Sequence, residues 1–215
     1  MPCRFFNHHE KFVRMDLQHV DSLPIESHPF PPFMPEGATV LFMGTFPPKP
    51  NRWSMAFYYP NPNNDFWRIM GLIFLNDKDA LWLPTEKKFD EQAIRCLMSE
   101  HHIALSDTGH VIRRLKDNAS DKFLEIIEPV PLASLLEQMP HCRYLATTGE
   151  KAADTLAAIT DTATPKMGQW CKTTLQNPHR QLQISRLPST SRAYPMKIEE
   201  KAKYYREFLH QAGVL

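Results

Sequence analysis

Short apolar runs alternate with longer amphipathic stretches along most of this chain. Val40–Met43 is a continuous apolar run, which is typical of a strand buried on both faces, and Gly44 ends it. We therefore predict a strand at 39–43. A loop rich in proline, asparagine and aromatic residues follows, and helical periodicity then extends over 64–75. This pattern predicts one β-loop-α unit.

The same alternation recurs to the end of the chain. It predicts further strands at 103–105, 144–146 and 182–187, and further helices at 91–101, 131–139, 150–159 and 196–212. We also expect a short helix in 12–20, a surface loop at 82–89 and a polar loop at 106–121. Strands that alternate with helices favour a parallel sheet between helical layers. The predicted fold is an α/β three-layer αβα sandwich with a central, mostly parallel four-stranded sheet.

Length and composition indicate one ordinary globular domain. The chain has 215 residues, 42% hydrophobic and 23% charged, so we expect a single domain at 1–215, with a lead-in at 1–36 and a core at 37–215. No apolar run reaches the length of a membrane span and the start lacks a signal-peptide pattern, so a soluble, cytoplasmic protein is expected. The four cysteines form no CxxC pair, so neither a zinc site nor a cysteine-ligated iron–sulfur cluster has the expected spacing, and the cysteines are interpreted as reduced, mostly structural thiols. We expect no metal and no cofactor.

Positive charge is concentrated near the end of the sequence. From Lys166 to His210 there are nine Lys or Arg residues against three acids, a net +6, whereas the whole chain has a net charge of +1. Such asymmetry indicates a polyanion-binding face, although basic residues on exposed helices are also common.

Ligands of parallel sheets bind outside the carboxyl ends of the strands. Four loops lie there in the predicted fold, at 44–65, 106–121, 147–150 and 188–195. The first carries flat rings, amides and prolines, which suit a planar polar ligand. The last, with its Ser and Thr residues, one arginine and one tyrosine, suits phosphate, but an ordinary Ser/Pro turn has the same composition.

These two loops resemble motifs one and two of the uracil-DNA glycosylase superfamily. The first reads G-x-x-P, then an aromatic residue, a proline and N-x-F-W; the second reads LPSTS at 187–191. They are most similar to the hypoxanthine and the mismatch-specific uracil-DNA glycosylase branches. IALSDT, an Arg followed by NASD, and TTGEKAA give weaker support. The resemblance covers the chain from about Pro29 onward. The first motif is carried by Gly44, Pro47, Tyr59, Pro62, Asn64, Phe66 and Trp67.

The resemblance implies an enzyme that flips a deaminated base, uracil or hypoxanthine, out of damaged DNA and hydrolyses its N-glycosidic bond without a metal. Other branches place a water-activating Asp, Asn or Glu just after the glycine, but this chain has Thr45 and Phe46 there. In the hypoxanthine branch the asparagine of N-x-F-W is taken as catalytic, which corresponds to Asn64. Asn64 is equally placed to cap the helix that follows, and Asp65 is the nearest ionisable alternative.

The resemblance also implies a set of contact residues. We expect Tyr59 to stack on the base, Ser189 and Ser191 to bind phosphates, and Arg192 or Tyr194 to fill the vacated base stack. The expected partner is damaged DNA, duplex or single-stranded, bound by a monomer that is nucleoid-associated and not bound to a membrane. The residues expected to bind the base are Gly44, Thr45, Phe46, Pro47, Tyr59 and Phe66, and those expected to bind DNA are Ser189, Thr190, Ser191, Arg192 and Tyr194.

Two other functions stay open at this point. The protein could bind damaged DNA without cleaving it, since no acid follows Gly44, or it could hydrolyse free nucleosides. His110 and His179 lie near candidate loops and could assist the leaving group, but a lone histidine is more often structural.

Overall fold

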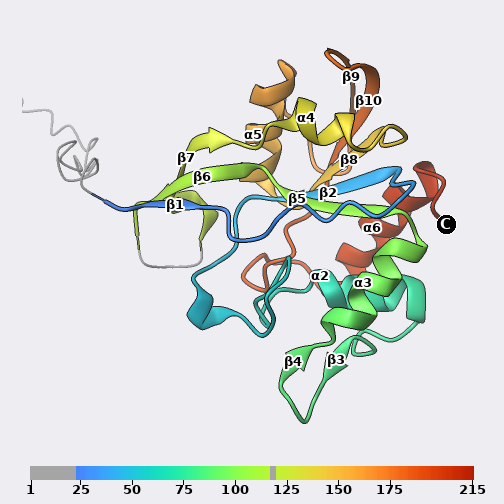
Figure 1. Cartoon of the computed structure of the whole chain (residues 1–215). Helices are drawn as coiled ribbons and strands as arrows, with labels where there is room; N and C mark the ends of the chain where they lie inside the picture. Colours follow the sequence, from blue (N-terminus) through green and yellow to red (C-terminus); the bar gives the residue numbers. More distant parts are fainter. Residues whose placement is uncertain (1–22, 117–119) are drawn as a thin grey trace, which may run out of the picture.

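The computed structural model describes residues 23–116 and 120–215, so the helix predicted at 12–20 lies outside the described residues. Its central sheet has five strands in the order β5-β2-β8-β10-β9, and the first four in this order run parallel (Figure 1). Their bounds are β2 Val40–Gly44, β5 Ile103–Asp107, β8 Tyr144–Thr147, β9 Trp170–Gln176 and β10 His179–Arg186. The mixed α/β fold and the parallel strands are confirmed.

The prediction of four strands is wrong because it missed β9. This strand pairs antiparallel with β10 at the edge of the sheet. Its side chains are exposed or half-buried, and its sequence, WCKTTLQ, is mostly polar. An edge strand with one solvated face and no continuous apolar run has little hydrophobic signal in the sequence.

Helices cover both faces of the sheet (Figure 1). Alternate residues of β2 enter two separate cores: Val40 and Phe42 pack on the side of α2, α3 and α6, whereas Leu41 and Met43 pack on the side of α4 and α5. Burial on both faces explains the continuous apolar run of this strand. The helices are α2 Phe66–Met70, continued by the π-helix η2 Gly71–Leu75, then α3 Glu91–Glu100, α4 Leu132–Glu137, α5 Glu150–Thr160 and α6 Ile198–Gln211.

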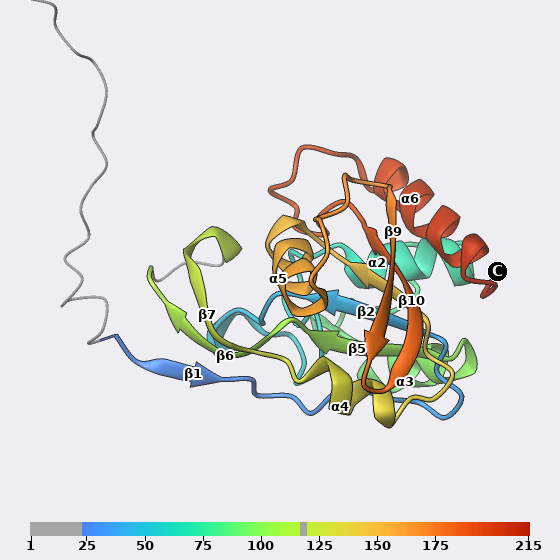
Figure 2. The same cartoon turned by 90° about the horizontal axis from the view of Figure 1, so that it is seen from above.

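A small antiparallel sheet lies beyond the carboxyl ends of β2 and β5 (Figure 2). It has the order β1-β6-β7, formed by Ile25–Ser27, Gly109–Arg114 and Leu124–Pro129. The prediction of a polar loop throughout 106–121 is therefore wrong. Strand β6 was missed because it carries Arg114 at a buried position, where the guanidinium pairs with Glu26 of β1 through two contacts of 2.9 Å.

Other differences are local. Residues 82–89 form a short hairpin, β3 Trp82–Leu83 with β4 Lys88–Phe89, instead of an irregular loop. The 3-10 turn η1 Pro50–Arg52 lies within the predicted loop 44–65, and a second, η3 Asp121–Phe123, begins at the last residue of the predicted loop 106–121. No helix in the described parts of the chain is long and apolar enough to cross a membrane.

Candidate functional site

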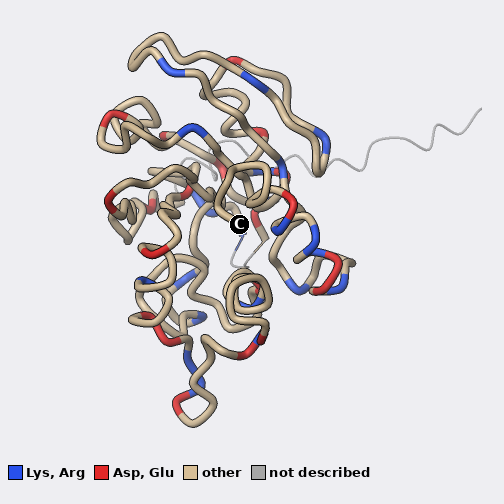
Figure 3. The backbone as a smooth tube through the Cα atoms, turned by 90° about the vertical axis from the view of Figure 1, so that its right-hand side faces the viewer, with Lys and Arg blue, Asp and Glu red and all other residues tan. Residues whose placement is uncertain are grey.

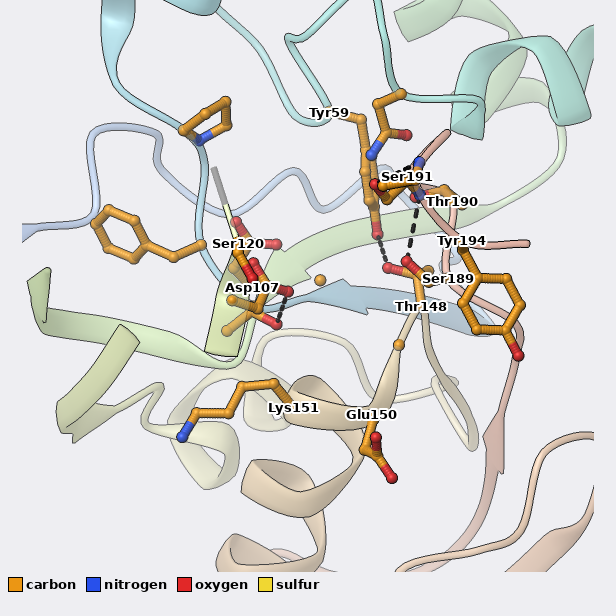
Figure 4. Close-up of a pocket in the computed structure, with 18 of the residues that line it drawn as sticks. Tyr59, Asp107, Ser120, Thr148, Glu150, Lys151, Ser189, Thr190, Ser191 and Tyr194 are labelled. Atoms are coloured by element: carbon orange, nitrogen blue, oxygen red, sulfur yellow. Dashed lines mark hydrogen bonds between the residues drawn. The ribbon is translucent and has the colours of Figure 1, made fainter. Parts of the chain in front are cut away.

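A cavity of about 990 Å³ lies at the carboxyl edge of the parallel strands. All four loops predicted to meet at this edge contribute to its lining, together with the small sheet. Figure 4 shows Tyr59, Asp107, Thr148 and Ser189 around this cavity. Of the residues predicted from the sequence, those that line the cavity are Gly44, Thr45, Phe46, Pro47, Tyr59, Asn64, Ser189, Thr190, Ser191 and Tyr194.

The two motif loops are joined directly by backbone pairing. Asn64 and Ser191 form an antiparallel bridge, and the N–H of Asp65 donates to the carbonyl of Thr190 at 2.8 Å. These contacts hold the end of the first loop against the second. Residues separated by more than a hundred positions in the sequence are therefore fixed in one wall of the cavity.

Asp65 strengthens this junction with two charged contacts. Its carboxylate lies 3.1 Å from the ammonium of Lys201, which is fully buried, and 3.1 Å from Nε of Arg192. Lys201 also donates to the carbonyl of Ser191 at 2.8 Å. Arg192 does not line the cavity, so the structure places it at the back of the second loop, where it pairs with Asp65.

Tyr59 is held rigidly at the cavity wall. Its ring stacks on Phe66 with centroids 3.8 Å apart, and its hydroxyl lies 3.2 Å from that of Thr148. Its φ of 50° lies in the left-handed region, which is uncommon for a residue with a large side chain and marks a strained position. Phe66 is fully buried and does not line the cavity, so its part is to support the ring of Tyr59 from behind.

Asn64 lies at the start of the helix and faces the cavity. Its Oδ1 accepts the N–H of Phe66 at 2.9 Å, as a helix-capping side chain does. An amide oxygen has two lone pairs, so this bond leaves one for a ligand or a water. The geometry thus fits both roles considered for Asn64.

Thr45 directly follows Gly44 and cannot ionise, but its side chain contacts a carboxyl group from another part of the chain. The hydroxyl of Thr45 donates to Oδ2 of Asp121 at 2.7 Å. Burial raises the pKa of Asp121 to about 6; the Thr45 hydrogen bond, Arg114 and Lys151 lower it, and the charge of Asp107 raises it. The carboxyl groups of Asp107 and Asp121 therefore both border the cavity with Gly44, although neither residue directly follows Gly44 in the sequence.

Asp107 and His28 form a buried pair; the sequence places Asp107 at the rim of the sheet, but it indicates neither His28 nor the contact between the two. Nε2 of His28 lies 2.9 Å from Oδ2 of Asp107, and both side chains are less than a tenth exposed. Burial alone would lower the pKa of His28, but the hydrogen bond and charge of Asp107 and a bond to Phe30 outweigh it and raise that pKa. The polar end of the strand predicted at 103–105 was the available signal for Asp107; nothing in the sequence pattern marked His28.

His110 and His179, the two histidines considered from the sequence, do not line the cavity. His110 is exposed on β6. His179 is the first residue of β10, whereas the cavity lies beyond the last residue of that strand. No group of three or more His, Cys, Asp or Glu residues in the described ranges could hold a metal ion.

The basic segment near the end of the chain does not form one face. Lys201 is buried, Arg180 donates to main-chain carbonyls of Leu136 and Met139, and Arg186 lies 3.3 Å from Glu150. Figure 3 shows Lys and Arg interspersed with Asp and Glu over the described chain. The cavity lining carries Arg186 of this segment, and Arg114, Lys122 and Lys151 from other parts of the chain.

The comparisons show a known fold. No protein-family model and no curated protein matches the chain. A solved solution NMR structure of a protein from Methanosarcina acetivorans, named "putative Uracil DNA glycosylase", superposes with a TM-score of 0.54 at 20% sequence identity. The match covers 87% of this chain and 100% of that one. The described molecule is thus an α/β protein that shares the fold of that structure and carries a large cavity at the carboxyl edge of its sheet.

Proposed function

We propose that this protein is a monofunctional DNA glycosylase that removes a deaminated base, uracil or hypoxanthine, from DNA. The observation that carries the proposal is the convergence of the two motif loops on one cavity, with Tyr59, Asn64 and Ser189 in its lining. A cavity of about 990 Å³ is large enough for an extruded nucleotide. The name of the Methanosarcina acetivorans protein, which has the same fold, agrees with this assignment.

The residues have the following roles in this proposal. The base leaves the DNA stack and lies against the ring of Tyr59. Asn64 orients a water, which attacks C1′ of the deoxyribose as the C–N bond breaks and its electron pair passes to the base. The departing base takes up a proton, and the water loses one. Backbone N–H groups near Thr45 and Phe46 stabilise the oxygens of the base as it gains negative charge.

The second loop binds the DNA backbone. Ser189 and Ser191 offer hydroxyl groups at the cavity mouth, and Tyr194, which also lines the cavity, fills the space that the base vacates. Arg192 is paired with Asp65, so its part is to hold the loop in place. No metal has a part in this mechanism.

The direct test uses oligonucleotides with a single uracil, hypoxanthine or xanthine, in duplex and single-stranded form. Excision leaves an alkali-labile abasic site that appears as a cleaved strand after heating in alkali. Binding without cleavage of any of these would indicate a damage-binding protein. Cleavage of free deoxyuridine or deoxyinosine, with no excision from DNA, would indicate a nucleoside hydrolase.

Asn64→Ala separates the two roles of this residue when it is compared with Asn64→Ser. Serine still caps a helix, but it has no amide oxygen to orient the water. We expect both variants to lose at least about 100-fold in single-turnover excision rate while they retain DNA affinity. Activity in the serine variant close to that of the wild type would show that Asn64 acts only as a cap.

A further inference from the structure

Asp121 brings a carboxyl group to the cavity from a segment that belongs to neither motif loop. It is the first residue of the 3-10 turn η3, is half-buried and lines the cavity. Its Oδ2 accepts the hydroxyl hydrogen of Thr45 at 2.7 Å. Because Thr45 directly follows Gly44, this bond holds Asp121 beside the first motif loop, although the two residues are 76 positions apart in the sequence.

Thr45 is a well-fixed partner for this carboxyl group. The residue is buried, and its carbonyl accepts the N–H of Gly109 at 2.9 Å. In the described parts of the chain, no hydrogen bond involves Oδ1 of Asp121. Since Oδ2 is engaged as an acceptor, Oδ1 is the oxygen that carries the proton when the carboxyl group is neutral. It is also the oxygen left for a ligand in the cavity.

The surroundings of Asp121 favour its protonated form. Burial is the largest cause, and the charge of Asp107 on β5 acts in the same direction; the Thr45 hydrogen bond, Arg114 on β6 and Lys151 on α5 act against them. Together they raise the pKa of Asp121 to about 6. A carboxyl group with a pKa close to neutral pH still holds its proton in part of the molecules and releases it readily, as a general acid must.

In the proposed function, the two sides of the cavity contact different parts of the nucleotide. Asn64 is bridged to Ser191, a residue proposed to bind phosphate, so this side faces the sugar. The N–H groups near Thr45 and Phe46 face the oxygens of the base, and Asp121 is bonded to the side chain of Thr45. Hypoxanthine and xanthine carry O6 and N7 on one edge of the ring. A purine whose O6 accepts one of these N–H groups therefore has N7 on the side of Asp121.

We propose that Asp121 is a general acid that gives its Oδ1 proton to N7 of a departing purine, hypoxanthine or xanthine. This inference rests on the proposed glycosylase function. As the bond from C1′ to N9 breaks, its electron pair passes to the purine ring, and the proton from Asp121 joins N7, so the base leaves neutral. The water that attacks C1′ loses its proton to solvent, and the Asp121 carboxylate takes up another from solvent before the next turnover.

Uracil depends less on such an acid. The negative charge of departing uracil spreads over two carbonyl oxygens, which backbone N–H groups stabilise without a proton transfer. The contribution of Asp121 should therefore be large for purines and small for uracil. This difference separates an acid that protonates the base from a residue that only shapes the cavity, because a change of shape affects both bases.

The test measures single-turnover excision of hypoxanthine and of uracil, each in the same duplex, from about pH 5 to about pH 9. For hypoxanthine, the wild-type rate should fall about tenfold per pH unit above about pH 6, because only the protonated acid acts. Asp121→Asn should remove this break and lower the hypoxanthine rate at about pH 6 by about 100-fold or more. The uracil rate should change by less than about tenfold, since its departure needs no proton from the acid.

The matched control is Asp154→Asn. Asp154 is exposed on α5 and also lines the cavity, and asparagine keeps an acceptor for the Thr164 hydroxyl. This variant should keep the wild-type break and rates, and thermal unfolding reports whether each variant is folded. A break that persists in folded Asp121→Asn, or an equal loss for hypoxanthine and uracil, would overturn the inference alone.

The wild-type results separate the inference from the proposed function. Excision of uracil but of neither purine would overturn the inference and leave the proposed function standing. Excision of no base would overturn both. If the protein removes purines alone, the presence or absence of the pH break in Asp121→Asn decides.

Thr45 acts as a positioning residue, and rescue tests that role. Its hydrogen bond lowers the pKa of Asp121, so Thr45→Val should move the break in the hypoxanthine profile above pH 6 and reduce the rate below the break. Thr45→Ser keeps a hydroxyl donor and should restore both. A break and a rate in the valine variant equal to those of the wild type would show that Thr45 has only a structural role.

Discussion

At the scale of single residues, Asp121, which lines the cavity, makes the free energy of unfolding depend on pH. Burial raises its pKa from the ordinary 3.8 to about 6. Between these pH values the unfolded chain loses its proton while the folded protein keeps it. The contribution of Asp121 to the free energy of unfolding therefore falls as pH rises from 3.8 to about 6, and it stays constant above that range.

Asp121→Asn should remove this dependence, because the amide cannot ionise and still accepts the Thr45 hydroxyl. We compare the free energy of unfolding of the variant with that of the wild type at each pH. From pH 4 to pH 7 we expect this difference to change in favour of the variant by on the order of 1 to 3 kcal/mol. Urea unfolding at the two pH values measures this difference. Exposed Glu137→Gln is the control for loss of a carboxyl. A stability difference that does not change with pH would contradict the prediction.

The residues that could be predicted from the sequence are those whose neighbours in the chain define their position. Tyr59, Asn64 and Ser189 lie on loops that follow recognisable strands, and they do line one cavity. His28 could not be predicted, because its importance arises from a contact with Asp107 across 79 positions of sequence. Arg192 lies in the expected loop, but its side chain pairs with Asp65 and does not line the cavity.

At the scale of elements, the cavity depends on the junction between α6 and the two motif loops. Lys201 of α6 is fully buried and contacts Asp65 and the Ser191 carbonyl. Asp65→Asn would leave this ammonium without its carboxylate, at a cost of about 3 to 5 kcal/mol in free energy of unfolding. Urea unfolding measures the loss.

The double variant Asp65→Asn/Lys201→Met should recover much of this stability, because it removes the unpaired charge as well. The half-exposed ion pair of Glu91 and Arg95 on α3 provides a matched control, since Glu91→Gln should cost less than about 1 kcal/mol. If Asp65→Asn is no more destabilising than Glu91→Gln, the buried pair does not hold the junction.

Elements with a clear hydrophobic period were predicted well, and those without one were not. The parallel strands and most helices follow apolar patterns, because they bury one or both faces in the two cores. The residues of strand β9 are exposed or half-buried, and strand β6 has a polar end whose Arg114 side chain is buried. Their positions depend on pairing with distant strands, which a local pattern does not contain.

At the scale of the whole molecule, charge distribution decides where DNA phosphates would lie. The net +6 of the segment from Lys166 to His210 suggested a single basic face. The folded chain disperses it, since Lys201 and Arg180 are used internally. Lys122 and Lys151 at the cavity rim, which come from two different parts of the sequence, are the better candidates for phosphate contacts.

Each phosphate that a lysine neutralises steepens the salt dependence of binding, with a slope of log K against log salt close to −0.9 per contact. Lys122→Ala/Lys151→Ala should therefore weaken binding to duplex DNA and reduce that slope by about 2. Lys203 and Arg206, exposed on α6 outside the cavity lining, provide the comparison. Fluorescence anisotropy between 50 and 300 mM salt, roughly the range in which such slopes are measured, gives both values. The salt slope depends on the number of phosphate contacts, wherever on the protein they lie. If Lys203→Ala/Arg206→Ala changes the slope more than Lys122→Ala/Lys151→Ala does, the DNA backbone lies along α6 and away from the cavity.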